Sequence, residues 1–174
     1  KPYWQYWESH ARRHRDQWLK QTGLTIHEEP IEDFIEVYTK TPTKFSQSMF
    51  LDMLRGRGRC HGAYLRPWVM REDQTGKAIA GLVVLDVPEA RASIHLAAFT
   101  HPDGFKRSAG LGMIEHWFQD GLRQGLEFLD FDLFWSHGDP VAWQGFSRFK
   151  GQFGIHYHYY PQPFSNYFFA GRRW

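Results

Sequence analysis

Residues 107–112 read Arg-Ser-Ala-Gly-Leu-Gly and stand between a strand pattern and a helix pattern. The strand is predicted at residues 91–99, and an amphipathic helix is expected from about Ser108 to Gln124. Glycines at such a junction allow backbone N–H groups to approach a ligand, and the helix N-terminus adds partial positive charge. The stretch therefore predicts a seat for a pyrophosphate. A glycine-containing helix start without any ligand fits the same residues equally well.

Strand patterns flank this stretch on both sides. Three predicted strands, at residues 63–71, 77–87 and 91–99, precede it. The connections between them are short and turn-like, which forces an antiparallel meander. A nearly continuous apolar run at residues 126–133 predicts another strand after the helix. Because a strand, a helix and a strand in succession form a crossover, this strand should lie parallel to the one at residues 91–99.

Helical patterns occupy much of the rest of the chain. The first 23 residues predict one amphipathic, basic helix, whose apolar stripe consists of Trp4, Trp7, Ala11, His14 and Trp18. Such a stripe is more often core, or a face for a missing partner domain, than a ligand cage. A short strand at residues 24–28 follows, then a helix from Pro30 and another around Ser46 to Leu54.

The C-terminal part predicts a last helix and a hairpin. The helix fits Asp139 to Lys150, with Asp139 as N-cap and Pro140 at its first position. Strands are expected at residues 154–160 and 164–171. The whole pattern predicts an α+β fold, with a mixed but mostly antiparallel sheet flanked by helices.

Composition narrows the function without naming it. The 174 residues fit one domain, and aromatic residues reach 18% of the chain. A net charge of +2 permits a phosphorylated ligand and weakens the case for a dedicated RNA-binding module. The single cysteine, Cys60, excludes an intrachain disulfide and favours a reducing compartment. With no apolar run near the roughly 18 residues that span a bilayer, a cytoplasmic protein is expected.

The order of elements and the glycine stretch resemble the GNAT family of acyltransferases. In that family an Arg/Gln-x-x-Gly-x-Gly/Ala loop holds the pyrophosphate of acyl-CoA, and Arg107, Gly110 and Gly112 match its positions. The resemblance implies a donor site in which backbone N–H groups near Phe99 and Thr100 bind the developing oxyanion. Its expected residues are Phe99, Thr100, Arg107, Ser108, Ala109, Gly110, Leu111, Gly112 and Lys150.

A narrower resemblance links the chain to Fem-type proteins, which add amino acids to peptidoglycan precursors from aminoacyl-tRNA. Residues 125–131 read GLEFLDF and residues 149–154 read FKGQFG, similar to the closing signature of that group. Two features depart from it. Fem enzymes carry two GNAT-like domains in tandem and often lack a good CoA loop. This chain has room for one such domain, at residues 24–174, and keeps the loop.

The two resemblances imply an N-acyltransferase that moves an acyl or aminoacyl group from acyl-CoA or aminoacyl-tRNA to an acceptor amine. A peptidoglycan precursor is one expected acceptor, and tRNA, a second GNAT-like domain or self-association are the expected partners. The alternative is a GNAT-like domain that binds without catalysis, as half of a two-domain Fem-type protein. An acceptor amine can attack the donor carbonyl directly, so no covalent nucleophile is expected.

Candidate proton acceptors lie at the strand ends. Asp132 lies at the end of the strand at residues 126–133 and His137 follows that strand, whereas His101 follows the strand at residues 91–99. Histidine titrates near neutral pH, which suits a general base, but a solvated loop histidine explains His137 as well. Asp130 and Asp132 share a strand face, and either could instead cap the next turn.

Other basic residues have two interpretations each. Lys150 is expected, from the Fem resemblance, to contact a phosphate of donor or acceptor, and a surface lysine at a helix C-terminus is the alternative. Arg55, Arg57 and Arg59 alternate with glycines and could bind a phosphate backbone or form a solvated loop. His156 and His158 could begin a zinc site, but no third ligand stands at a suitable spacing, so no metal is expected.

Overall fold

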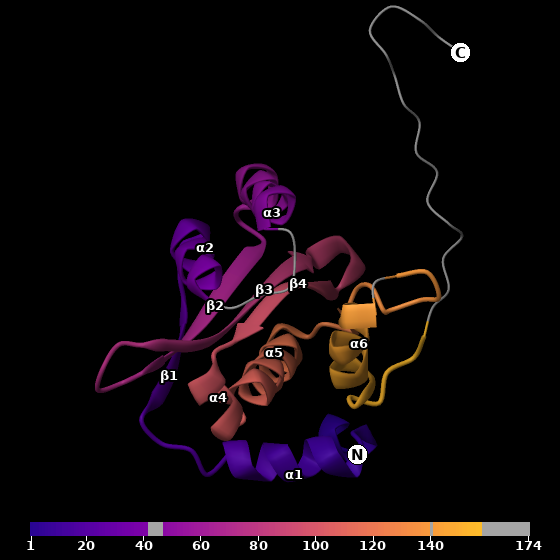
Figure 1. Cartoon of the computed structure of the whole chain (residues 1–174). Helices are drawn as coiled ribbons and strands as arrows, with labels where there is room; N and C mark the ends of the chain where they lie inside the picture. Colours follow the sequence, from indigo (N-terminus) through magenta and orange to yellow (C-terminus); the bar gives the residue numbers. More distant parts are fainter. Residues whose placement is uncertain (42–46, 140, 158–174) are drawn as a thin grey trace, which may run out of the picture.

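The computed structural model describes residues 1–41, 47–139 and 141–157. Five strands form one sheet in the order β1-β2-β3-β4-β5 (Figure 1). They are β1 (Leu24–Glu28), β2 (Leu65–Glu72), β3 (Ala78–Val87), β4 (Ala92–Thr100) and β5 (Phe128–Asp130). Neighbouring strands from β1 to β4 pair antiparallel, whereas β4 and β5 pair parallel. The predicted fold class, with a mixed and mostly antiparallel sheet, is confirmed.

Helices cover both faces of this sheet. The longer ones are α1 (Ser9–Trp18), α2 (Ile31–Lys40), α3 (Gln47–His61), α5 (Ala109–Gln124) and α6 (Gln144–Gly151). The shorter ones are η1 (Tyr3–Tyr6), η2 (Pro88–Ala90), α4 (Pro102–Lys106) and η3 (Val141–Trp143). Figure 1 shows α2 and α3 over one face and α1, α4 and α5 over the other. In the described part of the chain no helix is long and apolar enough to cross a membrane.

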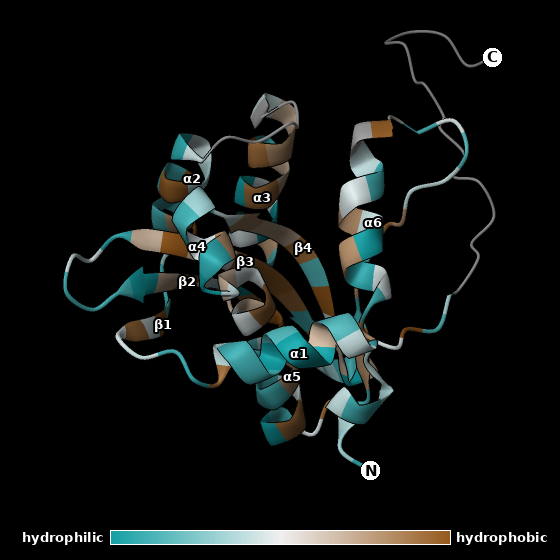
Figure 2. Ribbon diagram, turned by 60° about the horizontal axis from the view of Figure 1, so that its bottom comes forward, coloured by the Kyte–Doolittle hydropathy of each residue, from teal (hydrophilic) through white to brown (hydrophobic). Residues whose placement is uncertain are grey.

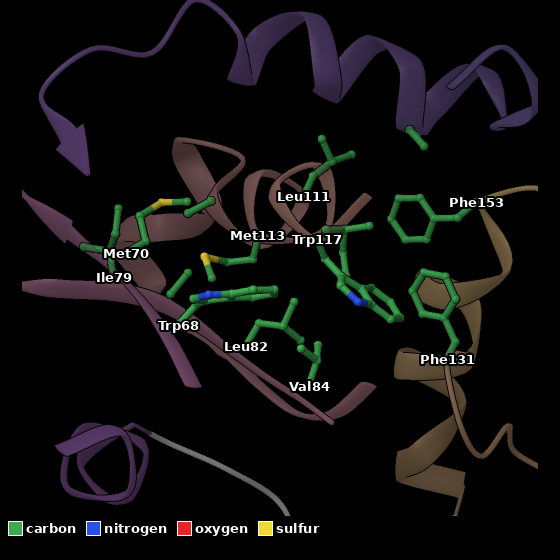
Figure 3. Close-up of a cluster of buried hydrophobic side chains, with 14 of the residues drawn as sticks. Trp68, Met70, Ile79, Leu82, Val84, Leu111, Met113, Trp117, Phe131 and Phe153 are labelled. Carbon is green, nitrogen blue, oxygen red and sulfur yellow. The ribbon is translucent and has the colours of Figure 1, made fainter. Parts of the chain in front are cut away.

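The period-two alternation of the strands divides the core into two clusters. Val83 of β3 packs with α2 and α3, whereas its neighbours Leu82 and Val84 pack with α5. Figure 3 shows the α5 side, where Trp68 and Trp117 lie between sheet and helix. Both tryptophans are fully buried. Each large side chain buried in this way stabilises the fold by about 1.5–3 kcal/mol.

The N-terminal segment packs on α5 and is not one continuous helix. Its chain breaks at Trp7, which is extended with ψ 150°, and α1 begins after Glu8. Trp7 and Ala11 are buried in the α5 cluster, and Trp18 packs against it. The predicted apolar stripe is therefore core, on two elements, while the outer face of α1 is mostly hydrophilic (Figure 2).

Helix α3 continues through the arginine-glycine run, which was expected to lie beyond the helix in a loop. A side chain at Gly58 would stand 3.2 Å from Ile31 Cγ2, so the glycine lets α3 approach α2 closely. Arg55 reaches across to Glu32, with Nε 3.2 Å from Oε2. Packing on α2 thus overrides the poor helix propensity of glycine.

The C-terminal expectations need three corrections. Strand β5 covers only 128–130, because Asp132 adopts a left-handed conformation with φ +58°. Asp139 is not an N-cap: its carboxylate accepts the Ser136 N–H at 2.8 Å, and α6 begins after Trp143. Residues 154–157 are not a strand, and Pro140 and the remaining hairpin lie outside the described residues.

One correction concerns the middle of the chain. The segment after β4, expected to be a loop from His101 to Lys106, is largely the short helix α4.

Candidate active site

The parallel strands separate soon after they begin to pair. Strand β5 pairs only with Ala92, Ser93 and Ile94 of β4. Strand β4 continues to Thr100, so residues 95–100 have no strand neighbour on that side among the described residues. We call residues 95–100 the open edge. The point just after Ile94, where β4 and β5 stop pairing, we call the fork. At about 3.4 Å per residue the open edge is about 17 Å long.

One end of the open edge meets the N-terminus of α5. A side chain at Gly110 would stand 2.7 Å from Thr100 Oγ1, so the first turn of α5 lies against the end of β4. The Gly112 N–H bonds to Ser108 O at 2.9 Å. The N–H groups of residues 109–111 precede this bond and have no acceptor within α5. They are the candidates for the predicted anion seat, at the helix end that carries partial positive charge.

The side chains of this loop are largely occupied by the protein itself. Trp18 lies where a Gly112 side chain would be, 2.6 Å from the ideal Cβ position. Arg107 donates to Thr22 O at 2.6 Å and to Glu72 at 3.3 Å. These contacts account for Arg107 and Gly112 without a ligand. The backbone of residues 109–111, rather than these two side-chain positions, remains the candidate seat.

Ser108 has an unusual backbone at the same junction. Its φ of +54° is rare outside glycine, and its hydroxyl lies 2.9 Å from His14 Nδ1 of α1. Among the described residues only Arg91, Ser108 and Asp132 combine a side chain with positive φ. Ser108 lies at the α5 end of the open edge, and Asp132 lies near the fork. Such conformations concentrate at functional sites, where surrounding contacts hold them in place.

Asp132 lies at the fork, directly after β5. Its N–H donates to Asp130 Oδ1 at 2.7 Å, so Asp130 caps the turn as one of the sequence interpretations allowed. Burial by the surrounding chain raises the pKa of the Asp132 carboxyl, although Lys150 and Arg57 act in the opposite direction. The residue as a whole is nevertheless exposed to solvent. A raised pKa together with access to solvent suits a group that accepts a proton.

Lys150 points into the protein rather than toward a phosphate. Its ammonium is buried and donates to two backbone oxygens, Phe131 O and Leu133 O. It also lies 5.1 Å from the centre of the Phe146 ring. Burial lowers the pKa of Lys150 to about 8, opposed by the nearby carboxylates Asp132 and Asp130. The expected contact with a donor phosphate does not fit this inward orientation.

His95 is a site residue that the sequence analysis missed. It is the first residue of the open edge, and its buried ring stacks on Phe131 with centroids 6.1 Å apart. Burial, together with the positive charge of Lys150, lowers the pKa of His95 to about 3, so the ring is neutral at neutral pH. The available signal was a histidine in the middle of a mostly apolar strand.

The other predicted proton acceptors lie elsewhere. His101 caps α4, where its Nδ1 accepts the Asp103 N–H at 3.4 Å, and it follows β4 at the α5 end of the open edge. His137 lies in an exposed turn. Phe99, which was predicted as a backbone donor and not as a proton acceptor, has its side chain buried on the α2 side of the sheet. Of the predicted catalytic residues, Asp132 is the one placed directly at the fork.

The structure adds no support for the arginines considered as phosphate ligands or for the histidines considered as zinc ligands. Arg55 is paired with Glu32, whereas Arg57 and Arg59 are exposed. His156 is exposed and His158 lies outside the described residues. No group of three possible metal ligands occurs within residues 1–41, 47–139 and 141–157.

Comparison with known proteins identifies the fold. No family model and no curated protein matches the sequence. A ribosomal-protein-alanine N-acetyltransferase from Brucella melitensis biovar Abortus 2308 superposes with TM-score 0.56 at 12% identity, over 83% of this chain and all of that one. An aminoglycoside 6'-N-acetyltransferase from Acinetobacter baumannii gives TM-score 0.55 at 13% identity, covering 84% and 99% of the two chains. The fold is that of GNAT acetyltransferases.

A third GNAT structure bears on the donor. AAC(6')-Iy, with TM-score 0.55 and 12% identity over 84% of this chain and 99% of its own, was solved with a bisubstrate analogue that contains CoA. At such identities the likeness establishes the GNAT fold and leaves the narrower Fem resemblance a prediction. The open edge and the N-terminus of α5 are the features of this fold on which a function can be argued.

Two surface hollows lie away from the open edge. One, of 640 Å³, is lined by Tyr3, Trp4, Phe118 and Phe153 among others. The second, of 470 Å³, lies between residues 134–135 and α6. Neither includes a residue of β4 or the start of α5. The candidate site is therefore defined by unpaired backbone and by the fork.

Proposed function

We propose that this protein is an N-acyltransferase that moves an acyl group from a CoA thioester to an amine. The observation that carries the proposal is the open edge of β4, which runs from the anion seat at α5 to Asp132 at the fork. A diphosphate seat, an extended backbone edge and a candidate base are thereby arranged in a line. This order matches a donor with a diphosphate at one end and a thioester at the other.

The donor is proposed to lie along the open edge. Its diphosphate would bind the N–H groups of residues 109–111, where the helix dipole favours negative charge. The predicted backbone donors Phe99 and Thr100 stand beside Gly110, so we assign them to the arm of the donor. Backbone N–H groups closer to the fork are then left for the oxyanion that develops on the thioester carbonyl.

The reaction follows from this placement. The neutral acceptor amine attacks the thioester carbonyl, a C–N bond forms, and the C–S bond breaks with the thiolate as leaving group. Asp132 accepts the proton that the amine nitrogen loses. Its raised pKa makes it a better base than an ordinary carboxylate, because proton transfer is most effective when the pKa lies near the working pH.

An aminoacyl-tRNA donor is the less favoured version of the same function. Of its predicted phosphate contacts, Lys150 is buried against backbone oxygens and Arg55 is paired with Glu32. A peptidoglycan acceptor and a cytoplasmic location stay predictions of the Fem resemblance and of the cysteine content. A domain that binds without catalysis would keep donor affinity and show no dependence on Asp132.

Calorimetric titration with CoA and acetyl-CoA, followed by mass spectrometry of a panel of small amines incubated with acetyl-CoA, tests the proposal. Asp132→Asn should retain donor binding but lose about 100-fold or more in transfer rate, the usual contribution of a general base. The exposed Asp16→Asn serves as control. Absence of donor binding by the parent protein at millimolar concentration would rule out the CoA-dependent function. Equal rates for Asp132→Asn and the parent would assign the proton to another group.

A further inference from the structure

Asp132 is held in a conformation that its own backbone disfavours. Residues with a side chain rarely adopt φ near +58°, and a single such residue costs of the order of 1 kcal/mol or more. Aspartate tolerates this region better than most residues, but it still requires contacts that hold it there. The contacts around Asp132 identify what supplies that constraint.

Lys150 binds the chain on both sides of Asp132. Its ammonium donates to the carbonyl of the residue before, Phe131, and to the carbonyl of the residue after, Leu133, the latter at 3.0 Å. On the outer side of the turn, Asp130 Oδ1 accepts the Asp132 N–H at 2.7 Å. A single buried cation thus holds the peptide group directly before Asp132 and the peptide group that follows Leu133, so it spans the turn that carries the candidate base.

The position of the ammonium is itself tightly defined. Lys150 is 8% exposed and its Nζ lies 5.1 Å and 5.6 Å from the ring centres of Phe146 and Phe134. Moving it would leave Phe131 O and Leu133 O without this donor. Leaving a buried polar group unsatisfied costs about 1–3 kcal/mol, so the arrangement resists relaxation.

The charged and polar groups around the Lys150 ammonium influence both its own charge and that of Asp132. The carboxylates Asp130 and Asp132 lie near enough to favour its charge. His95, from β4, faces it as a buried ring whose neutral form the charge favours. The interaction between Lys150 and Asp132 therefore bears on the charge of the base as well as on its position.

We propose that Lys150 is a positioning residue that holds the Asp132 carboxylate at the fork of the sheet. The inference rests on the proposed function, because it concerns the base of that reaction. Lys150 touches neither donor nor acceptor in this account. It acts by fixing the turn at residues 131–133, and this turn carries the β5 side of the chain away from the open edge.

The first test is a carbon-detected NMR titration of the Asp132 side chain in the parent protein and in Lys150→Met. If Lys150 positions the carboxylate, the turn relaxes in the variant, and the backbone carbon shifts of residues 131–133 leave the values typical of a left-handed residue at Asp132. If Lys150 acts through charge alone, removal of the cation raises the pKa of the Asp132 carboxyl and leaves those backbone shifts in place. Unchanged backbone shifts overturn the proposal. This readout needs no substrate, so it stands apart from the proposed function.

The second test is kinetic and uses acetyl-CoA with an amine accepted by the parent. Lys150→Met should lower kcat tenfold or more and leave the KM for acetyl-CoA within about twofold. Lys40→Met, at an exposed lysine of α2, is the matched control and should leave both unchanged. A raised KM with unchanged kcat would instead place Lys150 in donor binding and contradict the proposal. A parent without turnover would count against the proposed function alone.

Lys150→Met could also unfold the protein, so a second variant removes the other constraint. Asp130→Ala deletes the acceptor of the Asp132 N–H at an exposed position and leaves the buried lysine in place. It should lower kcat in the same direction and by a smaller factor. Unchanged kcat and an unchanged Asp132 titration in Asp130→Ala would mean that the turn does not need to be held, and the proposal would fail.

Discussion

At the scale of single residues, the site depends on polar groups placed where the chain is otherwise apolar. His95 is the clearest case, because its ring is buried between the sheet and Phe131. Its pKa is lowered to about 3 from 6.5, so between these two values the unfolded chain binds a proton that the folded chain does not. Stability is therefore present above about pH 6.5 and is lost as pH falls through this window.

This linkage gives a prediction. Replacing the ring by an apolar side chain in His95→Leu should reduce the fall in unfolding free energy below pH 6.5, because this ring no longer takes up a proton on unfolding. Part of the fall should remain, since burial also lowers the pKa of His14 and of His116. Urea unfolding at several pH values measures it, with His27→Leu at an exposed position of β1 as control. An unchanged pH slope in His95→Leu would show that other groups cause the acid sensitivity.

At the scale of elements, the contact between α1 and α5 explains one of the two loop glycines. Trp18 occupies the space above Gly112, and any Cβ there would have to displace the ring. We expect Gly112→Ala to cost about 1–3 kcal/mol through overpacking. In a Trp18→Ala background the cost should fall sharply, because the ring is gone.

A double-mutant cycle followed by urea unfolding measures this coupling. Gly56→Ala on α3, where a Cβ has no neighbour within 4 Å, is the control for helix propensity alone. Strictly additive effects of Gly112→Ala and Trp18→Ala would contradict the packing account. Lost CoA binding with unchanged stability in Gly112→Ala would return this glycine to the donor site.

At the scale of the whole molecule, residues 1–23 behave as part of the core rather than as an appendage. Glu115 of α5 is 4% exposed and is paired with Arg15 at 2.9 Å and bonded by Tyr3 at 2.7 Å. Removing residues 1–23 would delete both of these partners and expose the face of α5 that they cover. The buried aromatic contacts of Trp7 with Phe118 and Phe153 would be lost as well.

We therefore predict that a chain starting at Leu24 unfolds at much lower temperature than the full chain, or does not fold. In the full chain Glu115→Leu should also lower the melting temperature, because Arg15 and Tyr3 then lose their buried partner. Calorimetric melting of the three proteins measures this. A truncated chain as stable as the full one would mean that the N-terminal segment contributes little to the fold.

Some elements of this structure could be predicted from the sequence and others could not. The meander and the crossover were correct because alternating strands and short turns leave few arrangements. Strand β5 was predicted too long, since the contacts at the left-handed turn around Asp132 come from Lys150, which is 18 positions away in α6. The arginine run was misassigned because Gly58 packs on Ile31, a contact between distant segments. Arg107 and Gly112 fit a family motif, yet their contacts with Thr22, Glu72 and Trp18 are tertiary.

The most direct test of the central claim is an amide NMR titration of the full chain with CoA. A donor seated along the open edge should shift the amide signals of residues 109–111 and of residues 95–100 together, saturably and with one affinity. Signals from β1, at the opposite edge of the sheet, should stay in place. Saturable shifts confined to other parts of the chain, or no shifts at millimolar CoA, would contradict the account.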